Sequence, residues 1–254
     1  MVGFLPEYRL NIDHINERLG DCVLIEPALF AYGKFHQERI NLRVNPDHEC
    51  LFRDHPYVDL VQEPNFHEVK LSPQLAFNRA HRDRLPFASG YFYQLGINPQ
   101  SQRFHYKMFG MVEQPKVERI VIAPYSRSCS SKHGKRGNIQ PPREWWTPII
   151  EQANLPIYML GSNDDEVFPG TIGYLGHDFR EVVEFLNASK VLISVETGIL
   201  HLASAARVPT IFLSSATPEW FCKPDTPCRV ITANYPDEWD QKSVIKTLYN
   251  LHEF

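Results

Sequence analysis

The feature that most constrains the fold is a regular alternation in the second half of the chain. Short apolar runs at residues 119–124, 156–161, 190–195 and 210–213 alternate with segments whose apolar residues recur at helical spacing, at 141–154, 179–186 and 199–206. Continuously apolar strands separated by helices are typical of a parallel sheet that helices cover on both faces. The sequence therefore predicts an α/β fold.

The first half of the chain is less regular. Strands are predicted at residues 39–44 and 58–61, and a glycine turn leads into a helix near residues 22–30. The segment before Leu19 lacks an apolar first strand, and residues 66–111 can be assigned only loosely. A proline-containing break at 113–116 is the predicted linker. We therefore expect domains at residues 1–115 and 116–236, followed by a C-terminal helix at 237–254.

Composition excludes several classes of protein. Of the 254 residues, 43% are hydrophobic and 22% charged, a balance typical of globular domains rather than disordered, collagen-like or coiled-coil chains. No apolar run is long enough to cross a bilayer, so we expect no transmembrane segment and a cytoplasmic protein. The five cysteines form no C-x-x-C pair, which favours reduced thiols. Five histidines lack metal-ligand spacing, so no metal is expected; they are His48, His55, His67, His81 and His105.

Charge is distributed unevenly along the chain. The formal net charge of −4 weakens the case for non-specific binding of nucleic acid. Residues 119–143 nevertheless contain six Lys or Arg and no acidic residue. A cationic loop in an anionic protein indicates an anion site, such as one for a nucleotide or phosphate. The alternative is a solvated loop that binds nothing.

A strand–turn–helix junction at residues 194–201 is the strongest local signal. The amides of Thr197, Gly198 and Ile199 begin a helix directly after a buried strand, and the helix dipole favours an anion there. Ligands of open parallel sheets lie outside the carboxyl ends of the strands, so this turn, residues 162–166 and the basic loop are expected around one crevice. An ordinary strand-to-helix connection remains the alternative.

Four motifs in order give the chain a family resemblance. Residues 191–206 read VLISVETGILHLASAA, and the first half contains GDCVLIEPAL at 20–29, HPYVDLV at 55–61 and LGI at 95–97. This series resembles the heptosyltransferase-like glycosyltransferases of GT-B fold, in which the motif matched by residues 191–206 contains D-T-G-x-x-H. Glu196 stands where that family has aspartate. The resemblance implies two facing Rossmann-like lobes, with an acceptor site in the first and a nucleotide-sugar site in the second.

The resemblance also implies roles for individual residues. Asp21 matches the catalytic base, on a loop that faces the cleft. The alternative for an aspartate after Gly20 is a turn or cap residue, and the resemblance favours catalysis. The donor diphosphate and sugar would be held by Glu196, Thr197, Gly198, Ile199 and His201, by Ser126, and by one of Lys135, Lys132 and Arg136, with Lys135 preferred. The nucleotide's ribose and base would lie near Gly161, Asp165 and Glu166, which could instead be solvated acids after a strand.

The leading hypothesis is an inverting, metal-independent transfer of a sugar from a nucleotide-diphosphate sugar to a hydroxyl acceptor. The nucleotide sugar is a co-substrate, and no other cofactor is implied. The acceptor could be a saccharide or a glycolipid. A second hypothesis, suggested by the short first lobe, is a viral-type transferase that acts on a hydroxymethylated DNA base. A third is a nucleotide-sugar-binding protein without catalysis. We expect a monomer.

Overall fold

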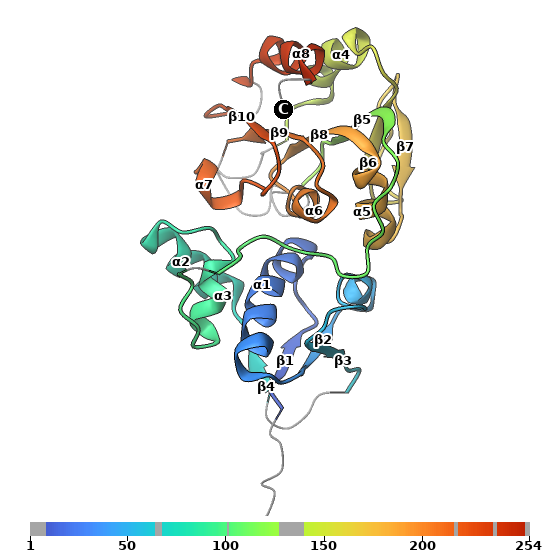
Figure 1. The fold of residues 1–254 in the computed structure, drawn as a ribbon. Coiled ribbons are helices and arrows are strands. Elements are labelled where there is room, and N and C mark those ends of the chain that lie inside the picture. Colours follow the sequence, from blue (N-terminus) through green and yellow to red (C-terminus); the bar gives the residue numbers. More distant parts are fainter. Residues whose placement is uncertain are drawn as a thin grey trace, which may run out of the picture. The chain divides into compact units, whose positions relative to one another are not determined.

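The computed structural model describes residues 9–63, 68–100, 102–126, 140–215, 218–235 and 238–251. The chain divides into two compact units, Met1–Gly110 and Met111–Phe254. Each unit contains one parallel β-sheet with helices packed against it (Figure 1). The boundary between the units falls just before the break predicted at residues 113–116.

The first unit is built on a four-stranded parallel sheet with the strand order β3-β2-β1-β4. Its strands are β1 (Asn11–His14), β2 (Ile40–Val44), β3 (Val58–Leu60) and β4 (Glu68–Lys70). The long helix α1 (Leu19–His36) connects β1 to β2, and the short 3₁₀ helix η1 (Pro46–Leu51) lies between β2 and β3. Helices α2 (Pro73–Asp83) and α3 (Ser89–Gln94) follow β4.

Two parts of this unit differ from the sequence-based prediction. The segment before Leu19 does contain a first strand, β1, although its sequence NIDH buries only Ile12 and His14. The loosely assigned region contains α2 and α3. A Cβ on Gly90 of α3 would lie 2.1 Å from the carbonyl oxygen of Ala76 in α2, so these helices approach as closely as they do because residue 90 is glycine.

The second unit contains a six-stranded parallel sheet with the order β10-β9-β8-β5-β6-β7. Its strands are β5 (Val117–Ala123), β6 (Ile157–Gly161), β7 (Ile172–Leu175), β8 (Ser189–Val195), β9 (Thr210–Ser214) and β10 (Cys228–Thr232). Its helices are α4 (Arg143–Gln152), α5 (Phe179–Asn187), α6 (Gly198–Ala206), α7 (Glu219–Cys222) and α8 (Gln241–Tyr249). Of the C-terminal helix predicted at 237–254, α8 covers Gln241–Tyr249, and residues 237 and 252–254 lie outside the described residues.

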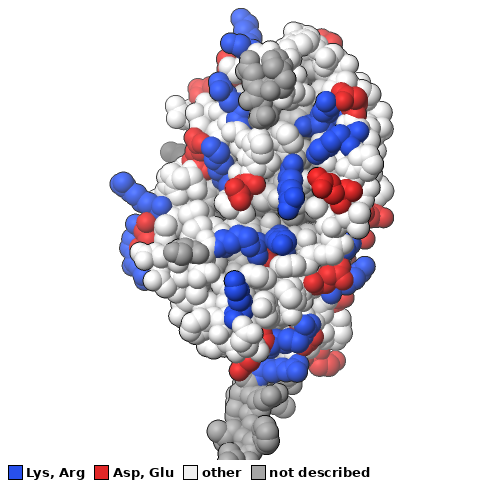
Figure 2. Space-filling view, in the orientation of Figure 1, with Lys and Arg blue, Asp and Glu red and all other residues white. Residues whose placement is uncertain are grey.

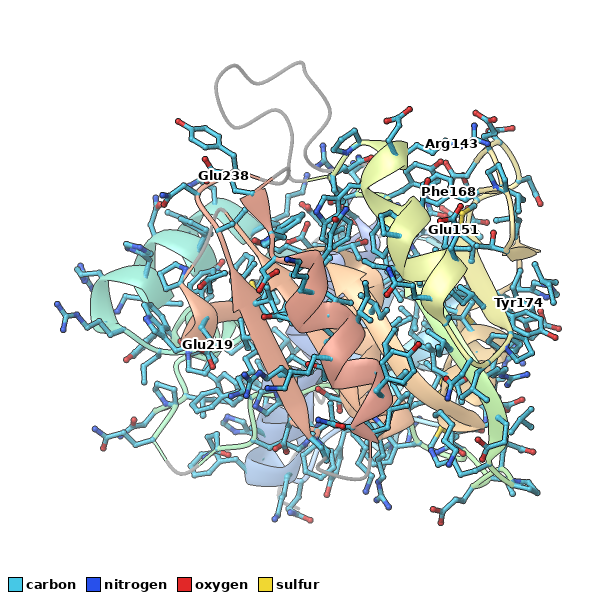
Figure 3. All side chains as sticks on the ribbon, turned by 90° about the horizontal axis from the view of Figure 1, so that it is seen from above. Arg143, Glu151, Phe168, Tyr174, Glu219 and Glu238 are labelled. Carbon is cyan, nitrogen blue, oxygen red and sulfur yellow. The ribbon has the colours of Figure 1, made fainter. Side chains whose placement is uncertain are left out.

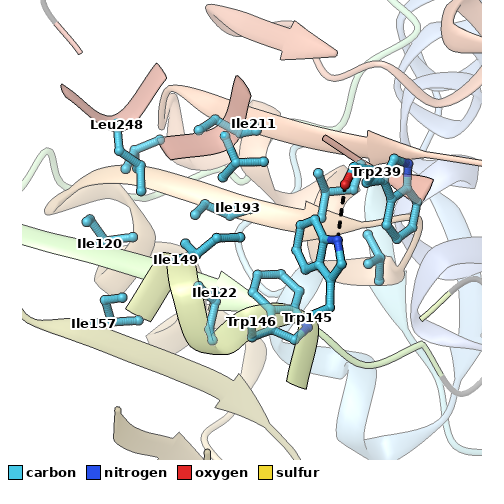
Figure 4. Close-up of a cluster of buried hydrophobic side chains, with 14 of the residues drawn as sticks. Ile120, Ile122, Trp145, Trp146, Ile149, Ile157, Ile193, Ile211, Trp239 and Leu248 are labelled. Carbon is cyan, nitrogen blue, oxygen red and sulfur yellow. Dashed lines mark hydrogen bonds between the residues drawn. The ribbon is translucent and has the colours of Figure 1, made fainter. Parts of the chain in front are cut away.

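The central strands of this sheet are buried on both faces. Ile120, Ile122 and Ile193 pack under α4 and α8 in one cluster (Figure 4). Their neighbours Val121 and Leu192 are equally buried and point to the opposite face, because side chains alternate along a strand. Helices α5 and α6 lie on that face (Figure 1). The α/β fold with a helix-covered parallel sheet is thus confirmed.

Tryptophans fix the end of this core. Trp145 and Trp146, at the start of α4, are both buried. The indole Nε1 of Trp145 donates to the carbonyl of Trp239 (3.1 Å; Figure 4), and that of Trp239 donates to the carbonyl of Ser214 (3.0 Å). These bonds tie α4 and the segment before α8 to the end of β9.

No helix in the described part of the chain is long and apolar enough to cross a membrane.

Candidate active site

Both sheets have a topological switch point, where successive connections leave a strand in opposite directions. In the first unit β2 and β3 lie on one side of β1 and β4 lies on the other. In the second unit β6 and β7 lie on one side of β5, whereas β8, β9 and β10 lie on the other. Ligands of open α/β sheets bind at the carboxyl ends of strands at such points. The segments after β1, β5 and β8 are therefore the first places to look for function.

Asp21 follows β1, but it does not lie on a loop as predicted. It occupies the first turn of α1, which begins at Leu19 after an extended Arg18. The amide of Cys22 donates to the carbonyl of Arg18 at 3.0 Å and closes this turn. A carboxylate in the first turn interacts favourably with the positive end of the helix dipole. Asp21 is thus held on a rigid element at the switch point of the first sheet.

The surroundings of Asp21 make it a stronger base than an ordinary aspartate. Burial, and then the charge of Glu17, raise the pKa of Asp21 to about 6, while Arg18 and a hydrogen bond from Tyr91 act in the opposite direction. The Tyr91 hydroxyl, on α3, donates to Oδ1 of Asp21 at 3.4 Å. A carboxylate with this pKa is mostly ionised at pH 7 and still binds a proton more readily than a solvated one.

A buried histidine lies beside Tyr91, the residue that hydrogen-bonds to this carboxylate. His14, the last residue of β1, is 1% exposed, and neither ring nitrogen has a hydrogen-bond partner among the described residues. Its ring stands edge-on to Tyr91, with ring centroids 6.2 Å apart. Burial lowers the pKa of His14 to about 4, so its imidazole is neutral at pH 7. Sequence reasoning missed His14 and Tyr91, because only folding brings β1 and α3 together near Asp21. It also missed Glu17, which lies close to Asp21 in the sequence but belongs to none of the motifs.

The turn after β8 has the predicted form. Thr197 is the extended N-cap of α6, and Gly198 and Ile199 are its first helical residues. The first amides of a helix have no acceptor within that helix, so this turn offers donors at the carboxyl edge of the sheet. His201 lies further along α6 and is partly exposed. Oε1 of Glu196 accepts a hydrogen bond from the Cys222 thiol of α7 at 3.6 Å.

The residues predicted around the nucleotide lie at the same edge but have local partners. Oδ2 of Asp165 accepts from the amide (2.6 Å) and hydroxyl (2.9 Å) of Ser162, so this carboxylate stabilises its own turn. A Cβ on Gly161 would lie 2.7 Å from the same Asp165 oxygen, so a larger residue at this position would require the Asp165 side chain to move. Glu166 pairs with Arg143, whose guanidinium lies 5.8 Å from the centre of the Phe168 ring (Figure 3).

Ser126 follows β5 and is buried. Its carbonyl accepts a hydrogen bond from the Gln140 side chain at 2.9 Å. The preferred Lys135 and its alternatives Lys132 and Arg136 lie outside the described residues. Across the described ranges, no group of three or more His, Cys, Asp or Glu side chains is placed to hold a metal ion.

Comparisons with known proteins identify the fold. No family model and no curated protein matches the sequence. Among solved structures, the iron-containing dodecameric glycosyltransferase TibC from enterotoxigenic E. coli is similar with a TM-score of 0.68 at 16% identity, over 90% of this chain but only 64% of TibC. This chain thus spans less than two thirds of TibC.

Two other solved structures are matched over nearly their whole length. A glycosyl transferase family 9 protein from Veillonella parvula has a TM-score of 0.68 at 14% identity, covering 96% of this chain and 97% of that one. The E. coli heptosyltransferase WaaC, solved with ADP, has a TM-score of 0.65 at 15% identity, covering 96% and 98%. The two-sheet architecture of this chain is therefore the GT-B fold of these glycosyltransferases.

Proposed function

We propose that this protein is an inverting glycosyltransferase that moves a sugar from a nucleotide-diphosphate sugar to a hydroxyl acceptor without a metal ion. The observation that carries the proposal is the Asp21 carboxylate, which has a raised pKa and is held at the switch point of a GT-B sheet. The motif resemblance in both halves of the chain supports it. The first unit would bind the acceptor and the second the donor.

In this mechanism Asp21 is the general base. Its carboxylate accepts the proton of the acceptor hydroxyl while that oxygen attacks C1 of the sugar. The bond from C1 to the diphosphate oxygen breaks on the opposite face, which inverts the configuration at C1. Positive charge develops on the sugar ring in the transition state. A base whose pKa is about 6 is ionised at neutral pH and still has a useful affinity for the proton.

The leaving diphosphate requires stabilisation of negative charge. The amides of Thr197, Gly198 and Ile199, at the positive end of α6, are preorganised donors for this purpose. His201 and a cation from the basic loop, Lys135 or else Lys132 or Arg136, would add to them. Donors of this kind can replace a metal ion at the diphosphate. Glu196 would contact hydroxyls of the donor sugar, and Ser126 would contact the diphosphate. Gly161, Asp165 and Glu166 would line the nucleotide.

Charge favours a saccharide or glycolipid acceptor over a DNA duplex. The net charge is −4, and acidic and basic side chains are interspersed on the face drawn in Figure 2. Non-specific duplex binding requires a concentrated basic surface. A transferase acting on a modified DNA base would instead lose activity steeply as salt is raised.

A panel of nucleotide sugars tests the proposal. WaaC is solved with ADP and TibC with ADP-D-beta-D-heptose, so ADP-linked sugars come first, followed by UDP-, GDP- and CDP-linked sugars. Donors are scored by thermal stabilisation of the full chain and by release of the nucleoside diphosphate with saccharide acceptors. At least one donor should stabilise the protein and release its nucleotide. A panel in which no donor does either would reject the proposal.

A further inference from the structure

The carboxylate of Glu196 has a partner on a different element of the second unit. Strands β8 and β9 are parallel neighbours, with Val195 paired to Leu213. Residues that follow these two strands therefore emerge at the same edge of the sheet. Glu196 follows β8, and the single-turn helix α7 follows β9. Cys222, the last residue of α7, is buried and donates its thiol hydrogen to Oε1 of Glu196 at 3.6 Å.

The length of the residue-196 side chain matters for this contact. An aspartate would hold its carboxylate about one carbon–carbon bond, ~1.5 Å, closer to the backbone. The sulfur-to-oxygen distance is already 3.6 Å, so a shorter side chain would leave the thiol beyond hydrogen-bond range. Lys223, which follows α7, pairs with Glu219 one turn away at 3.0 Å.

We propose that Cys222 is a positioning residue that holds the Glu196 carboxylate in the orientation that binds the donor sugar. The inference rests on the proposed donor role of Glu196 and deepens it. The thiol donates one hydrogen bond to Oε1, which restricts the rotamers that the Glu196 side chain can adopt. Glutamate at position 196 and cysteine at position 222 then form one functional pair.

A double-mutant cycle tests whether the two residues act together. The variants are Cys222→Ala, Glu196→Asp and the double variant, assayed for the KM of the nucleotide sugar and for kcat. Cys222→Ala should raise the KM of the nucleotide sugar about three- to tenfold. The kcat should change little, because Glu196 would bind the sugar equally well in the ground state and in the transition state. Glu196→Asp should also raise KM, and the double variant should be no worse than Glu196→Asp alone.

Two further variants separate positioning from packing. Cys222→Ser keeps a donor of similar size and should retain most of the affinity that Cys222→Ala loses. Cys50→Ala removes another buried thiol, in the first unit, and should leave the donor KM unchanged. Losses that multiply in the double variant, or equal losses in the serine and alanine variants, would overturn the proposal.

A second readout does not depend on catalysis. The ionisation of Glu196 can be followed by carboxyl carbon NMR in the full chain without ligand. Removing a hydrogen bond to the ionised form raises a carboxyl pKa, so Cys222→Ala should shift the Glu196 titration upward. An unchanged titration would overturn the pairing. An upward shift in a protein that turns over no nucleotide sugar would support the pairing and reject the proposed glycosyl transfer.

Discussion

The hydroxyl of Tyr91 donates a hydrogen bond to Oδ1 of Asp21 across 3.4 Å and joins α3 to the first turn of α1. This bond favours the ionised carboxylate and lowers its pKa. Glu17 has the opposite effect, because its negative charge disfavours a second negative charge nearby. Burial is the largest influence and sets the pKa near 6. Tyr91 and Glu17 therefore have opposite effects on the pKa of Asp21, and each can be substituted separately.

Opposite changes in the pH dependence of kcat/KM are expected from these two neighbours. Transfer should rise with pH through the pKa of Asp21, about 6, and level off above it. Tyr91→Phe removes the stabilising donor and should move the acid limb to higher pH. Glu17→Gln removes the repelling charge and should move that limb to lower pH. Profiles between pH 4 and 8 measure both, and shifts of the same sign would contradict this description of Asp21.

The contributions of His14 and Asp21 to the pH dependence of the free energy of unfolding are expected to have opposite signs. The folded pKa of His14 is about 4 against a usual 6.5, so the folded protein binds fewer protons there and His14 makes stability rise with pH in this window. The folded pKa of Asp21 is about 6 against a usual 3.8, so Asp21 makes stability fall as pH rises. The two slopes nearly cancel between pH 4 and 6.

Single variants should reveal each slope. Relative to the unmodified protein, His14→Phe should lose stability as pH rises from 4 to 6, and Asp21→Asn should gain it. Each difference should reach about 2 kcal/mol, because one pKa unit corresponds to about 1.4 kcal/mol. Urea unfolding at half-unit pH steps measures the free energies of unfolding. Differences that do not vary with pH would show that neither group has a perturbed pKa.

A buried ion pair holds the segment after α3 against α1. Glu26 is fully buried, its carboxylate accepts from Arg103 at 2.6 and 2.9 Å, and the amide of Lys107 donates to it at 3.1 Å. Arg103→Met would leave this carboxylate without its main partner. The expected loss is about 3 to 5 kcal/mol in the free energy of unfolding.

The matched control for the buried pair is an exposed one. Arg82 pairs with Asp83 on α2 with a side chain that is 64% exposed. Arg82→Met should cost less than about 1 kcal/mol, since exposed pairs contribute little. Urea unfolding of both variants compares the two sites directly. Equal losses in the two variants would mean that Glu26 is solvated after Arg103 is removed.

The sequence predicted those elements whose signal is local. Buried central strands such as β5 and β8 read as continuous apolar runs because both of their faces are covered. Strands β1 and β7 were not predicted, because they are only partly buried and their sequences contain no continuous apolar run. The Gly20-Asp21 and Glu196-Thr197-Gly198 motifs are likewise local. The neighbours Tyr91 and Cys222 come from distant segments, and only the packed structure reveals them.

The proposed catalytic role of Asp21 is tested most directly by comparing Asp21→Asn with the unmodified protein, using a donor that the panel identifies. Transfer is measured at pH 7.5 as release of the nucleoside diphosphate, and donor affinity is measured by calorimetry on the same samples. We predict that kcat falls at least ~100-fold, as expected for loss of a general base. The donor Kd should stay within about twofold, because the proposed donor residues belong to the other unit. A variant that keeps its kcat would contradict the assignment of Asp21 as the base.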